Sequence, residues 1–328
     1  MPLVTHGLQR SHDVACQLVH VAEALNGRLS HLQVVAVLSP NGRLSHVQVI
    51  AVLSLKGGVG KTTVVLGLAG AAVQRNLRTL VVDLDPQANA TAALRPKPTA
   101  ASIADVLDEP RRSVISNAIG VSAWSNDLHV LVGNEATERH NHPGPTTKQL
   151  ARLNRALTRL GDDVDSDPAA IYGLVVVDCP PSLGQLTRSA LVAADRAVLV
   201  TDPTIFAVTG VQRAFEAVQD ERVRGNTRLQ PLGVLINRVQ PRSSEHAFRV
   251  AELRELFGPL VLPATVPERS AIQQAQGACV PIQRWDTPGA REVAAVFDGL
   301  LSRVLRSRRR PGHATRPSAA SNGAPPSG

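Results

Sequence analysis

A glycine- and lysine-rich loop between a strand-like and a helix-like stretch constrains the fold more than any other feature of this sequence. Residues 47–54 form a largely apolar run, of the kind buried in a parallel sheet. The loop Lys56-Gly-Gly-Val-Gly-Lys-Thr62 follows it, and residues 62–76 are rich in small and apolar residues that suit a helix. A strand, a tight turn and a helix in this order predict an α/β fold with the loop at the carboxyl edge of the sheet.

The loop has the residues of a phosphate-binding loop. Its glycines let the backbone N–H groups point inward, and the start of the following helix adds partial positive charge: Gly57, Gly58 and Gly60. We expect Lys61 to neutralise β- and γ-phosphate oxygens and the Thr62 hydroxyl to bind Mg²⁺. Leu55 stands where the strict consensus has its first glycine, and Lys56 adds a second lysine. The alternative, an ordinary glycine turn, does not account for Lys-Thr-Thr at the start of the helix.

Composition favours a polyanionic partner and argues against several kinds of metal site. The formal net charge is +8 and the pI is about 10.3, which suits DNA, RNA, nucleotides or an anionic membrane, although an arginine-rich coding bias gives the same balance. The three cysteines have no C-x-x-C spacing, which argues against a structural zinc, an iron–sulfur cluster or a disulfide framework.

No signal peptide or membrane-length apolar run is evident, so a cytoplasmic protein is expected.

The chain begins with a duplicated segment. Residues 26–39 recur, with two substitutions, at 41–54, and only the second copy runs into the glycine loop. The first copy is open to three interpretations: a duplicated edge strand, a poorly ordered extension, or a mis-assigned translation start. We therefore divide the chain into an extension at 1–46 that is expected to be poorly ordered, a domain at 47–306, and a disordered tail rich in Arg, Pro and Ser at 307–328.

Strand-like and helix-like stretches alternate along the domain. Further strands are expected at 79–84, 174–178, 197–201 and 232–236, and leucines line one face of a helix between the second and third strands: Leu150, Leu153, Leu157 and Leu160. A looser, proline-containing region lies between 96 and 145, and 162–167 is a polar connection. The alternation predicts an α/β fold with a mostly parallel central sheet and helices on both faces.

Carboxylates follow two of these strands. Asp83 and Asp85 end one apolar run, and Asp178 ends another in the sequence Val-Val-Val-Asp-Cys-Pro-Pro. An apolar strand capped by Asp has the pattern of a Walker-B motif, in which the carboxylate holds a metal-bound water. Each Asp alone could instead be a helix cap or a turn residue. Together with the glycine loop, they predict a Mg²⁺-nucleotide site.

With these motifs the chain resembles the ParA/Soj-type partition ATPases, members of the deviant Walker-A group that also contains MinD. The resemblance runs from about Val47 to Arg306. It rests on Lys56-Gly-Gly-Val-Gly-Lys-Thr-Thr63, Asp83-Leu-Asp-Pro-Gln-Ala-Asn-Ala-Thr91 and Asp178-Cys-Pro-Pro-Ser-Leu-Gly184. A looser match covers 202–210 and 266–269. Val200 and Asp202 stand where ParA proteins commonly have Pro and Gln.

The resemblance implies a role for each site residue. Lys56 is the signature lysine that reaches the phosphates of a partner subunit's ATP, Asp85 orients or activates the hydrolytic water, and Asn237 contacts the adenine. Magnesium is supported by Thr62, Asp83 and Asp178. The nucleotide contacts are made by Lys56, Gly57, Gly58, Val59, Gly60, Lys61, Thr62, Thr63 and Asn237.

The resemblance also implies partners. ATP links nucleotide state to homodimerisation, the dimer binds DNA nonspecifically over the nucleoid, and a DNA-bound ParB-like partner stimulates slow hydrolysis. The extension at 1–46 is too short for the helix-turn-helix domain of larger relatives. Relatives place their DNA-binding surface in the carboxyl half, where this chain carries Arg213, Arg238, Arg242, Arg249, Arg254, Arg269 and Arg284. Each of these arginines alone reads as a solvated surface residue.

Two alternatives belong to the same superfamily. A MinD-like ATPase would bind membranes through residues 296–306, which are apolar on one side and followed by arginines. The last helix of an α/β domain shows the same stripe when it packs on its sheet, and the Asp-Pro-Gln and Asp-Cys-Pro-Pro motifs favour the ParA type. An iron-protein reductase needs a pair of cysteine thiolates, which Cys179 and Cys279 do not convincingly supply.

Overall fold

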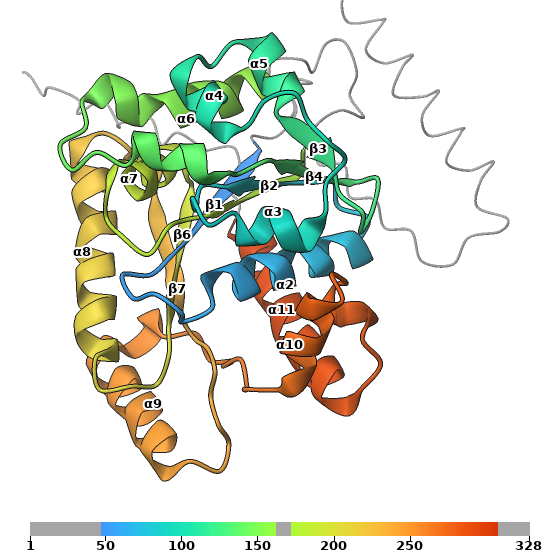
Figure 1. The fold of residues 1–328 in the computed structure, drawn as a ribbon. Coiled ribbons are helices and arrows are strands. Elements are labelled where there is room, and N and C mark those ends of the chain that lie inside the picture. The colour runs from blue at the N-terminus through green and yellow to red at the C-terminus, as the bar shows by residue number, and fades with distance from the viewer. Residues whose placement is uncertain (1–46, 162–171, 308–328) are drawn as a thin grey trace, which may run out of the picture. The chain divides into compact units, whose positions relative to one another are not determined.

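A seven-stranded sheet organises the domain (Figure 1). The structure is a computed structural model, and it describes residues 47–161 and 172–307. The strands follow the order β3-β4-β2-β5-β1-β6-β7, and all neighbours are parallel except β3, which pairs antiparallel with β4 at one edge. Their bounds are β1 Gln48–Leu53, β2 Thr79–Asp83, β3 Ile119–Val121, β4 Leu128–Leu131, β5 Leu174–Asp178, β6 Arg196–Thr201 and β7 Gln230–Ile236.

Helices cover both faces of the sheet, which gives three layers (Figure 1). One face packs against α2 (Lys61–Gln74), α3 (Asn89–Leu94), α10 (Ser270–Gly277) and α11 (Pro288–Arg306). The other packs against α4 (Ile103–Asp108), α5 (Arg112–Asn117), α6 (Thr147–Gly161), α7 (Gln185–Ala193), α8 (Ala207–Arg224) and α9 (Ser244–Phe257). Short 3₁₀ helices are η1 (Glu135–His140), η4 (Gly258–Leu260) and η5 (Ile282–Arg284).

The central strand β1 contributes to both cores. Val49, Ala51 and Leu53 belong to the core beneath α4–α9, whereas Ile50 and Val52 belong to the core beneath α2 and α11. Successive side chains of a strand point to opposite faces, so a strand buried on both sides reads as an unbroken apolar run. This explains why β1 shows no polar alternation in the sequence.

Helix α11 packs tightly on α2. A Cβ added at Gly67 of α2 would lie 2.4 Å from the ring of Phe297, so only glycine permits this approach. The apolar stripe of α11 is buried against α2 and the sheet: Val293, Phe297, Leu300, Leu301 and Val304. The carboxyl-terminal helix therefore supports the helix that carries the glycine loop.

The described part of the chain begins and ends at the amino-terminal edge of the sheet. At the end of α11, Ser307 accepts a bond from Arg196 Nη2 at its carbonyl oxygen (2.6 Å) and from Gln48 Nε2 at its Oγ (3.0 Å). Gln48 opens β1 and Arg196 opens β6. Nearby, Asp195 Oδ2 accepts a bond from Val49 N at 2.9 Å.

The predicted fold class is confirmed, since a mostly parallel sheet is flanked by helices on both faces. The strand expected at 174–178 has those bounds, and the others differ by one or two residues at one or both ends. The looser region at 96–145 holds more structure than expected, because α4, α5, β3, β4 and η1 lie within it. The predicted extension at 1–46, the polar connection at 162–167 and the tail beyond 307 lie outside the described residues. Among the helices described, none is long and apolar enough to cross a bilayer.

Candidate nucleotide site

The predicted site residues converge at the carboxyl edge of five neighbouring strands. In the order β2-β5-β1-β6-β7, β2 is followed by Asp85, β5 ends in Asp178, and β1 leads into the glycine loop. Strand β6 is followed by Asp202, and β7 is followed by Asn237. Parallel strands bring their carboxyl ends together, so residues distant in the sequence become neighbours. The site thus forms along one edge, between the loop and the segments that follow β2, β5, β6 and β7.

Two glycines of the loop adopt backbone conformations that L side chains rarely adopt. Gly58 has φ +77° and Gly60 has φ +91°. A Cβ at Gly60 would lie 2.2 Å from Nδ2 of Asn237, whereas a Cβ at Gly57 would meet open space. Gly60 is therefore required both by its backbone and by the side chain packed against it.

Lys61 and Thr62 begin α2 and face the end of β5. Lys61 is buried, 6% exposed, and its positive charge partly offsets the rise that burial causes in the pKa of Asp178. The Thr62 hydroxyl donates to Asp178 Oδ2 at 2.7 Å, and Asp178 Oδ1 is buried without a hydrogen-bond partner. A buried ammonium and a buried carboxylate oxygen both gain from a charged ligand, so this corner is suited to an anion and a cation together.

Asp83 and Asp178 lie side by side, because they pair in the register of β2 and β5. Burial raises the pKa of Asp83 to about 6. Burial, with the charge of Asp83 beside it, raises the pKa of Asp178 well above its usual range. Asp83 Oδ2 accepts two bonds from Thr91, from N and from Oγ1, both at 2.8 Å. The Asp83 carboxylate thus fixes the segment that follows β2, while one oxygen of Asp178 has no hydrogen-bond partner among the described residues.

Asp85 sits in the turn after β2. Its Oδ1 accepts from Gln87 N at 3.0 Å, its backbone N donates to Asp83 Oδ1 at 3.3 Å, and its carbonyl oxygen accepts from Ala88 N at 2.8 Å. The side chain is buried beside Asp83, whose charge interaction with it raises the pKa of Asp83. The turn therefore holds Asp85 at the site edge through its backbone and one carboxylate oxygen.

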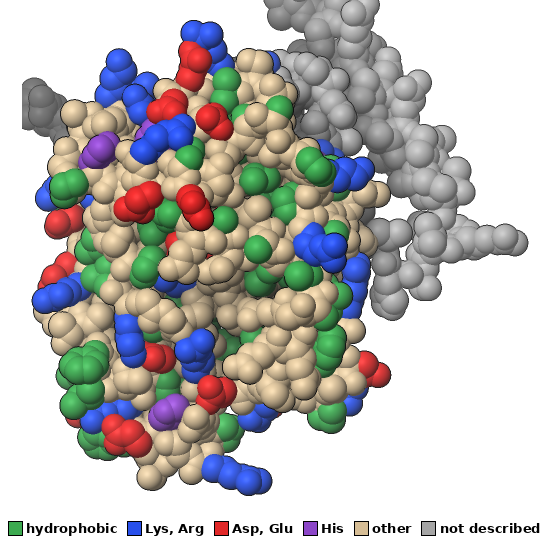
Figure 2. Space-filling model, in the orientation of Figure 1, with side chains coloured by type: hydrophobic (Ala, Val, Ile, Leu, Met, Phe, Trp, Pro, Cys, Tyr) green, Lys and Arg blue, Asp and Glu red, His purple; other side chains and the backbone are tan. Residues whose placement is uncertain are grey.

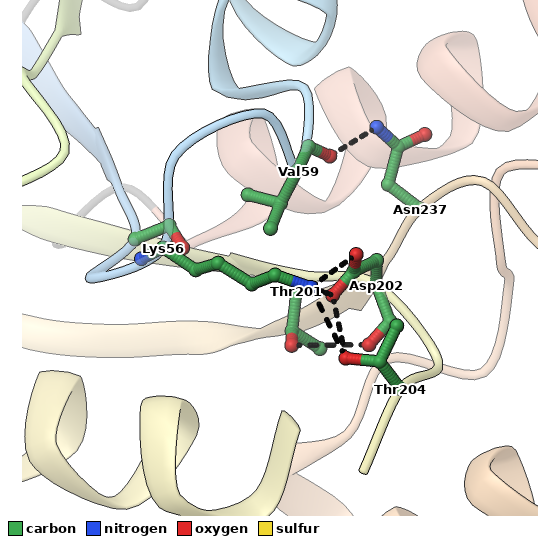
Figure 3. A network of polar contacts seen from close by, with 7 residues as sticks. Lys56, Val59, Thr201, Asp202, Thr204 and Asn237 are labelled. Atoms are coloured by element: carbon green, nitrogen blue, oxygen red, sulfur yellow. Dashed lines mark hydrogen bonds and ion pairs between the residues drawn. The ribbon is translucent and has the colours of Figure 1, made fainter. Parts of the chain in front are cut away.

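Lys56 contacts a segment of its own chain that follows β6 (Figure 3). Its ammonium donates to Asp202 Oδ2 at 2.8 Å, to Asp202 Oδ1 at 3.0 Å and to Thr204 Oγ1 at 3.2 Å. The sequence singled out both Lys56 and Asp202 but did not bring them together. In this structure of a single chain, all three ammonium donors have intramolecular acceptors.

Asn237 supports the loop from the end of β7. Its Nδ2 donates to Val59 O at 2.7 Å, as Figure 3 shows, and its Oδ1 is buried without a partner. Its backbone N donates to Thr201 O at 2.8 Å. The unpaired Oδ1 is an acceptor that a ligand donor at this end of the site would satisfy.

Two residues of the site were not assigned roles from the sequence. Thr91 donates from its hydroxyl to Asp83 and accepts from Gly133 N at 3.0 Å, so it joins the segment after β2 to the end of β4. Gln276 of α10 donates from Nε2 to Thr63 Oγ1 at 3.0 Å, which ties α10 to the first turn of α2. Thr91 is the last residue of the motif Asp83–Thr91, and this position was the sequence feature that could have indicated its role. Nothing local marked Gln276.

Several of the arginines expected on a DNA-binding face are engaged within the chain. Arg249 pairs with Glu245 and Glu252, Arg269 pairs with Glu292, and the other two donate to carbonyl oxygens: Arg254 to Pro263 and Arg284 to Trp124. Arg254 and Arg284 are nevertheless exposed, as are the three remaining members of the set, Arg213, Arg238 and Arg242. On the face drawn in Figure 2, basic side chains stand among acidic ones.

The two described cysteines lie apart in the fold and in different environments. Cys179 follows β5 and is wholly buried, and this burial raises the pKa of its thiol far above the usual range. Cys279 is partly exposed beside α10. Within the described residues, no group of three or more His, Cys, Asp or Glu side chains could hold a metal ion. The iron-protein alternative gains no support from this arrangement.

Comparison with known proteins identifies relatives over most of the domain. A family model described as an AAA domain matches residues 47–231, more than half of the chain. The chromosome-partitioning ATPase Soj of Thermus thermophilus is 30% identical over 259 residues, covering 75% of this chain and 92% of that protein. Protein IncC of Escherichia coli is 26% identical over 254 residues, covering 75% of this chain and 67% of its own length.

Solved structures share the fold. Cobyrinic acid a,c-diamide synthase from Mycobacterium smegmatis, with bound ADP and magnesium, superposes with a TM-score of 0.65 at 26% identity, covering 80% of this chain and 97% of the other. An ATP complex of McdA from Cyanothece gives a TM-score of 0.68 at 19% identity, covering 81% and 99%. At that lower identity the likeness speaks for the fold alone.

Proposed function

Since this chain belongs to the ParA/MinD-type P-loop ATPases, we propose that it binds and hydrolyses ATP with Mg²⁺ and dimerises with ATP bound. The dimer binds DNA nonspecifically and acts in chromosome or plasmid partition, or in the positioning of a related cargo. The observation that carries the proposal is the corner formed by Lys61, Thr62 and Asp178. It combines a buried cation, a hydroxyl and an open carboxylate oxygen at the start of a helix.

The residues of this corner fit Mg²⁺ and phosphate. Thr62 Oγ1 and the unpartnered Asp178 Oδ1 are hard oxygen donors of the kind that Mg²⁺ prefers. Asp83, the third proposed metal residue, supports the ion from beside Asp178, because its own oxygens already accept from Thr91 and Asp85. Magnesium, when bound, supplies positive charge that offsets the phosphate oxygens. Lys61 and the loop N–H groups of residues 57–62 hold the phosphates.

The remaining site residues take the roles that the family implies. Asp85 orients the hydrolytic water, supported by its fixed place in the turn beside Asp83. Asn237 accepts from the adenine amino group, supported by its unpaired Oδ1. Val59 and Thr63 line the loop and the first turn of α2, where Asn237 and Gln276 hold them.

The face beside the loop suits an interface with a second copy of the chain. Lys56 is the residue proposed to reach the partner's ATP, and it lies at this face. Directly after Thr204, two apolar side chains are solvent-exposed, Ile205 at 64% and Phe206 at 70%. Removing neighbouring apolar side chains from water lowers the free energy, which supports burial of this face in the ATP-bound dimer.

DNA binding would use basic side chains that have no acidic partner. Arg213, Arg238 and Arg242 are exposed in the carboxyl half of the described chain, and the formal net charge of the whole chain is +8. Neutralisation of phosphates by such residues is independent of base sequence and steeply salt-dependent. A ParB-like DNA-bound activator and association with the nucleoid complete the proposal by relation to the partition ATPases.

The membrane-binding alternative loses its main sequence argument. It rested on the apolar stripe of residues 296–306, and within α11 Phe297, Leu300, Leu301 and Val304 are buried in the domain core. A stripe that packs on α2 and the sheet is not available to lipid. The stripe is therefore accounted for by the fold.

The test is DNA binding by the purified protein with ATP, with ADP and without nucleotide. Wild type would be compared with Lys61→Ala and Asp85→Ala at two salt concentrations. We expect sequence-independent binding only with ATP, lost in Lys61→Ala, retained or prolonged in Asp85→Ala, and weakened at the higher salt.

Two other outcomes are informative. ATP hydrolysis without ATP-dependent DNA binding would keep the nucleotide site and reject the partition role. Liposome co-sedimentation with ATP would then be the next measurement. Binding that is equal with and without ATP would reject the coupling between nucleotide state and DNA.

A further inference from the structure

Lys56 and Asp202 form a contact that ties the loop to the end of β6. The Lys56 ammonium has three acceptors, two on Asp202 and one on Thr204, all within 3.2 Å. The partners are 146 residues apart in sequence. We call this contact, made by Lys56, Asp202 and Thr204, the lysine clasp.

We infer that the lysine clasp sets the threshold of ATP-dependent dimerisation, with Asp202 as the positioning residue that holds Lys56 within its own subunit. The inference rests on the proposed function, in which Lys56 reaches the phosphates of the partner's ATP. With its three N–H donors engaged by Asp202 and Thr204, the Lys56 ammonium has none left for a phosphate. Each subunit must therefore open its clasp before the dimer closes.

The acceptors of the clasp are held in place by contacts that do not involve Lys56. Asp202 follows the last residue of β6, Thr201, whose carbonyl oxygen accepts from Asn237 N at 2.8 Å. A turn after it is closed by a bond from Thr204 N to Asp202 O at 2.9 Å, and Thr204 Oγ1 donates to Asp202 Oδ1 at 3.2 Å. The carboxylate and the hydroxyl are thus oriented by the sheet edge and the turn.

The donor, in contrast, is free to leave. The Lys56 side chain is 42% exposed and that of Asp202 is 15% exposed. An ion pair with this much solvent contact shifts an equilibrium by about two- to fivefold. Because two clasps open for each dimer, the effect on the dimer Kd is the square of that factor, about 4- to 25-fold.

The first experiment measures the dimer Kd by sedimentation with ATP and Mg²⁺, in an Asp85→Ala background that slows hydrolysis. Asp202→Asn keeps the shape of the side chain and removes its charge. We expect its dimer Kd to fall about 4- to 25-fold, with monomer affinity for ATP unchanged. Thr204→Val should shift the Kd in the same direction by less. Asp220→Asn, on the exposed face of α8, is the matched control and should leave the Kd unchanged.

The second experiment tests the contact without nucleotide and without dimerisation. The chain has only four lysines, Lys56, Lys61, Lys97 and Lys148, so the acylation of each by an amine reagent is separable by mass spectrometry. Lys148 is exposed and serves as the internal reference. We expect Lys56 to react more slowly than Lys148 in wild type. Asp202→Asn should raise the ratio of the two rates about two- to fivefold.

The outcomes separate the clasp from the proposed function. An equal Lys56-to-Lys148 ratio in wild type and Asp202→Asn overturns the clasp. An unchanged or raised dimer Kd in Asp202→Asn, with an ATP-responsive background protein, overturns its role as a threshold and leaves the proposed function intact. Absence of ATP-dependent dimers in the background protein and in Asp202→Asn alike contradicts the proposed function, and the threshold with it.

Discussion

Asp83 and Asp178 are paired neighbours at the last residues of β2 and β5, and both are fully buried. Two buried carboxylates at adjacent strand ends repel each other when both are charged. Thr91 and Thr62 donate hydrogen bonds to the pair, and Lys61 adds positive charge beside Asp178. Without a cation the pair favours protonation, and its stability therefore depends on pH.

The first prediction concerns that pH dependence. Burial raises the pKa of Asp83 from 3.8 to about 6, so the folded state favours the protonated carboxyl. The stabilisation is fully present below a pH of about 4 and is lost as the pH rises through about 6. From pH 4 to pH 7.5, the unfolding free energy of wild type should therefore fall relative to that of Asp83→Asn by on the order of 2–3 kcal/mol. Urea unfolding in EDTA checks this, and parallel curves for the two proteins would contradict it.

The second prediction concerns the Thr62 hydroxyl. Thr62→Val keeps the shape of the side chain but removes the donor to Asp178 Oδ2 and the proposed magnesium ligand. We expect the affinity for Mg·ATP to fall at least about tenfold and the unfolding free energy to fall by about 1–3 kcal/mol. Thr62→Ser should retain both. Titration with a fluorescent ATP analogue, with Mg²⁺ or with EDTA, is the measurement, and equal losses in the two buffers would assign Thr62 no part in metal binding.

The third prediction compares two glycines of the loop. Gly60→Ala places a Cβ 2.2 Å from Asn237 Nδ2 at a residue with φ +91°, so we expect a loss of about 2–4 kcal/mol in stability and loss of nucleotide binding. Gly57→Ala meets open space and should cost less than about 1 kcal/mol. Thermal unfolding of both variants measures the contrast. Equal destabilisation of the two variants would contradict a special backbone requirement at Gly60.

The fourth prediction concerns base recognition by Asn237. Asn237→Ala removes the bond to Val59 O and the unpaired Oδ1. We expect ATP affinity to fall about tenfold and the preference for ATP over GTP to shrink, because the lost acceptor matches an amino group. Competition binding with the two nucleotides is the measurement. Equal losses for ATP and GTP would restrict Asn237 to supporting the loop.

The sequence alone supported the central strands and the loop because both depend on local pattern. Residues 174–178 show an unbroken apolar run that ends in Asp, and β5 has those bounds. The glycines of the loop are required by the left-handed φ values of Gly58 and Gly60. The motifs that follow β1, β2 and β5 lie at one edge of the sheet, as the sequence predicted, because parallel strands bring their carboxyl ends together.

The region between β2 and α6 could not be predicted in the same way. Strands β3 and β4 have three and four residues, and α4 and α5 have six each, which is too short for a clear period. The antiparallel pairing of β3 with β4 depends on tertiary contacts, including the bond from Val132 N to Ala118 O. Prolines in this region suggested only an irregular path.

Contacts between distant charges were equally hidden. Nothing near Lys56 indicates that its ammonium meets Asp202, because the pairing arises from the adjacency of β1 and β6. The same holds for Arg269, whose partner Glu292 lies on α11. A count of arginines in the carboxyl half could not separate those that support the fold from those that remain exposed.

The bonds from Gln48 and Arg196 to Ser307 have a practical consequence for experiments on this protein. They place the attachment points of both flanking segments, at Val47 and Ser307, on the edge of the sheet remote from the glycine loop. A fluorophore or affinity handle attached at either of these two residues is thus joined to the domain away from the nucleotide. Shortening the chain into α11 would instead remove Phe297, which packs against Gly67 of α2. A loss of function in such a variant could then reflect a structural defect.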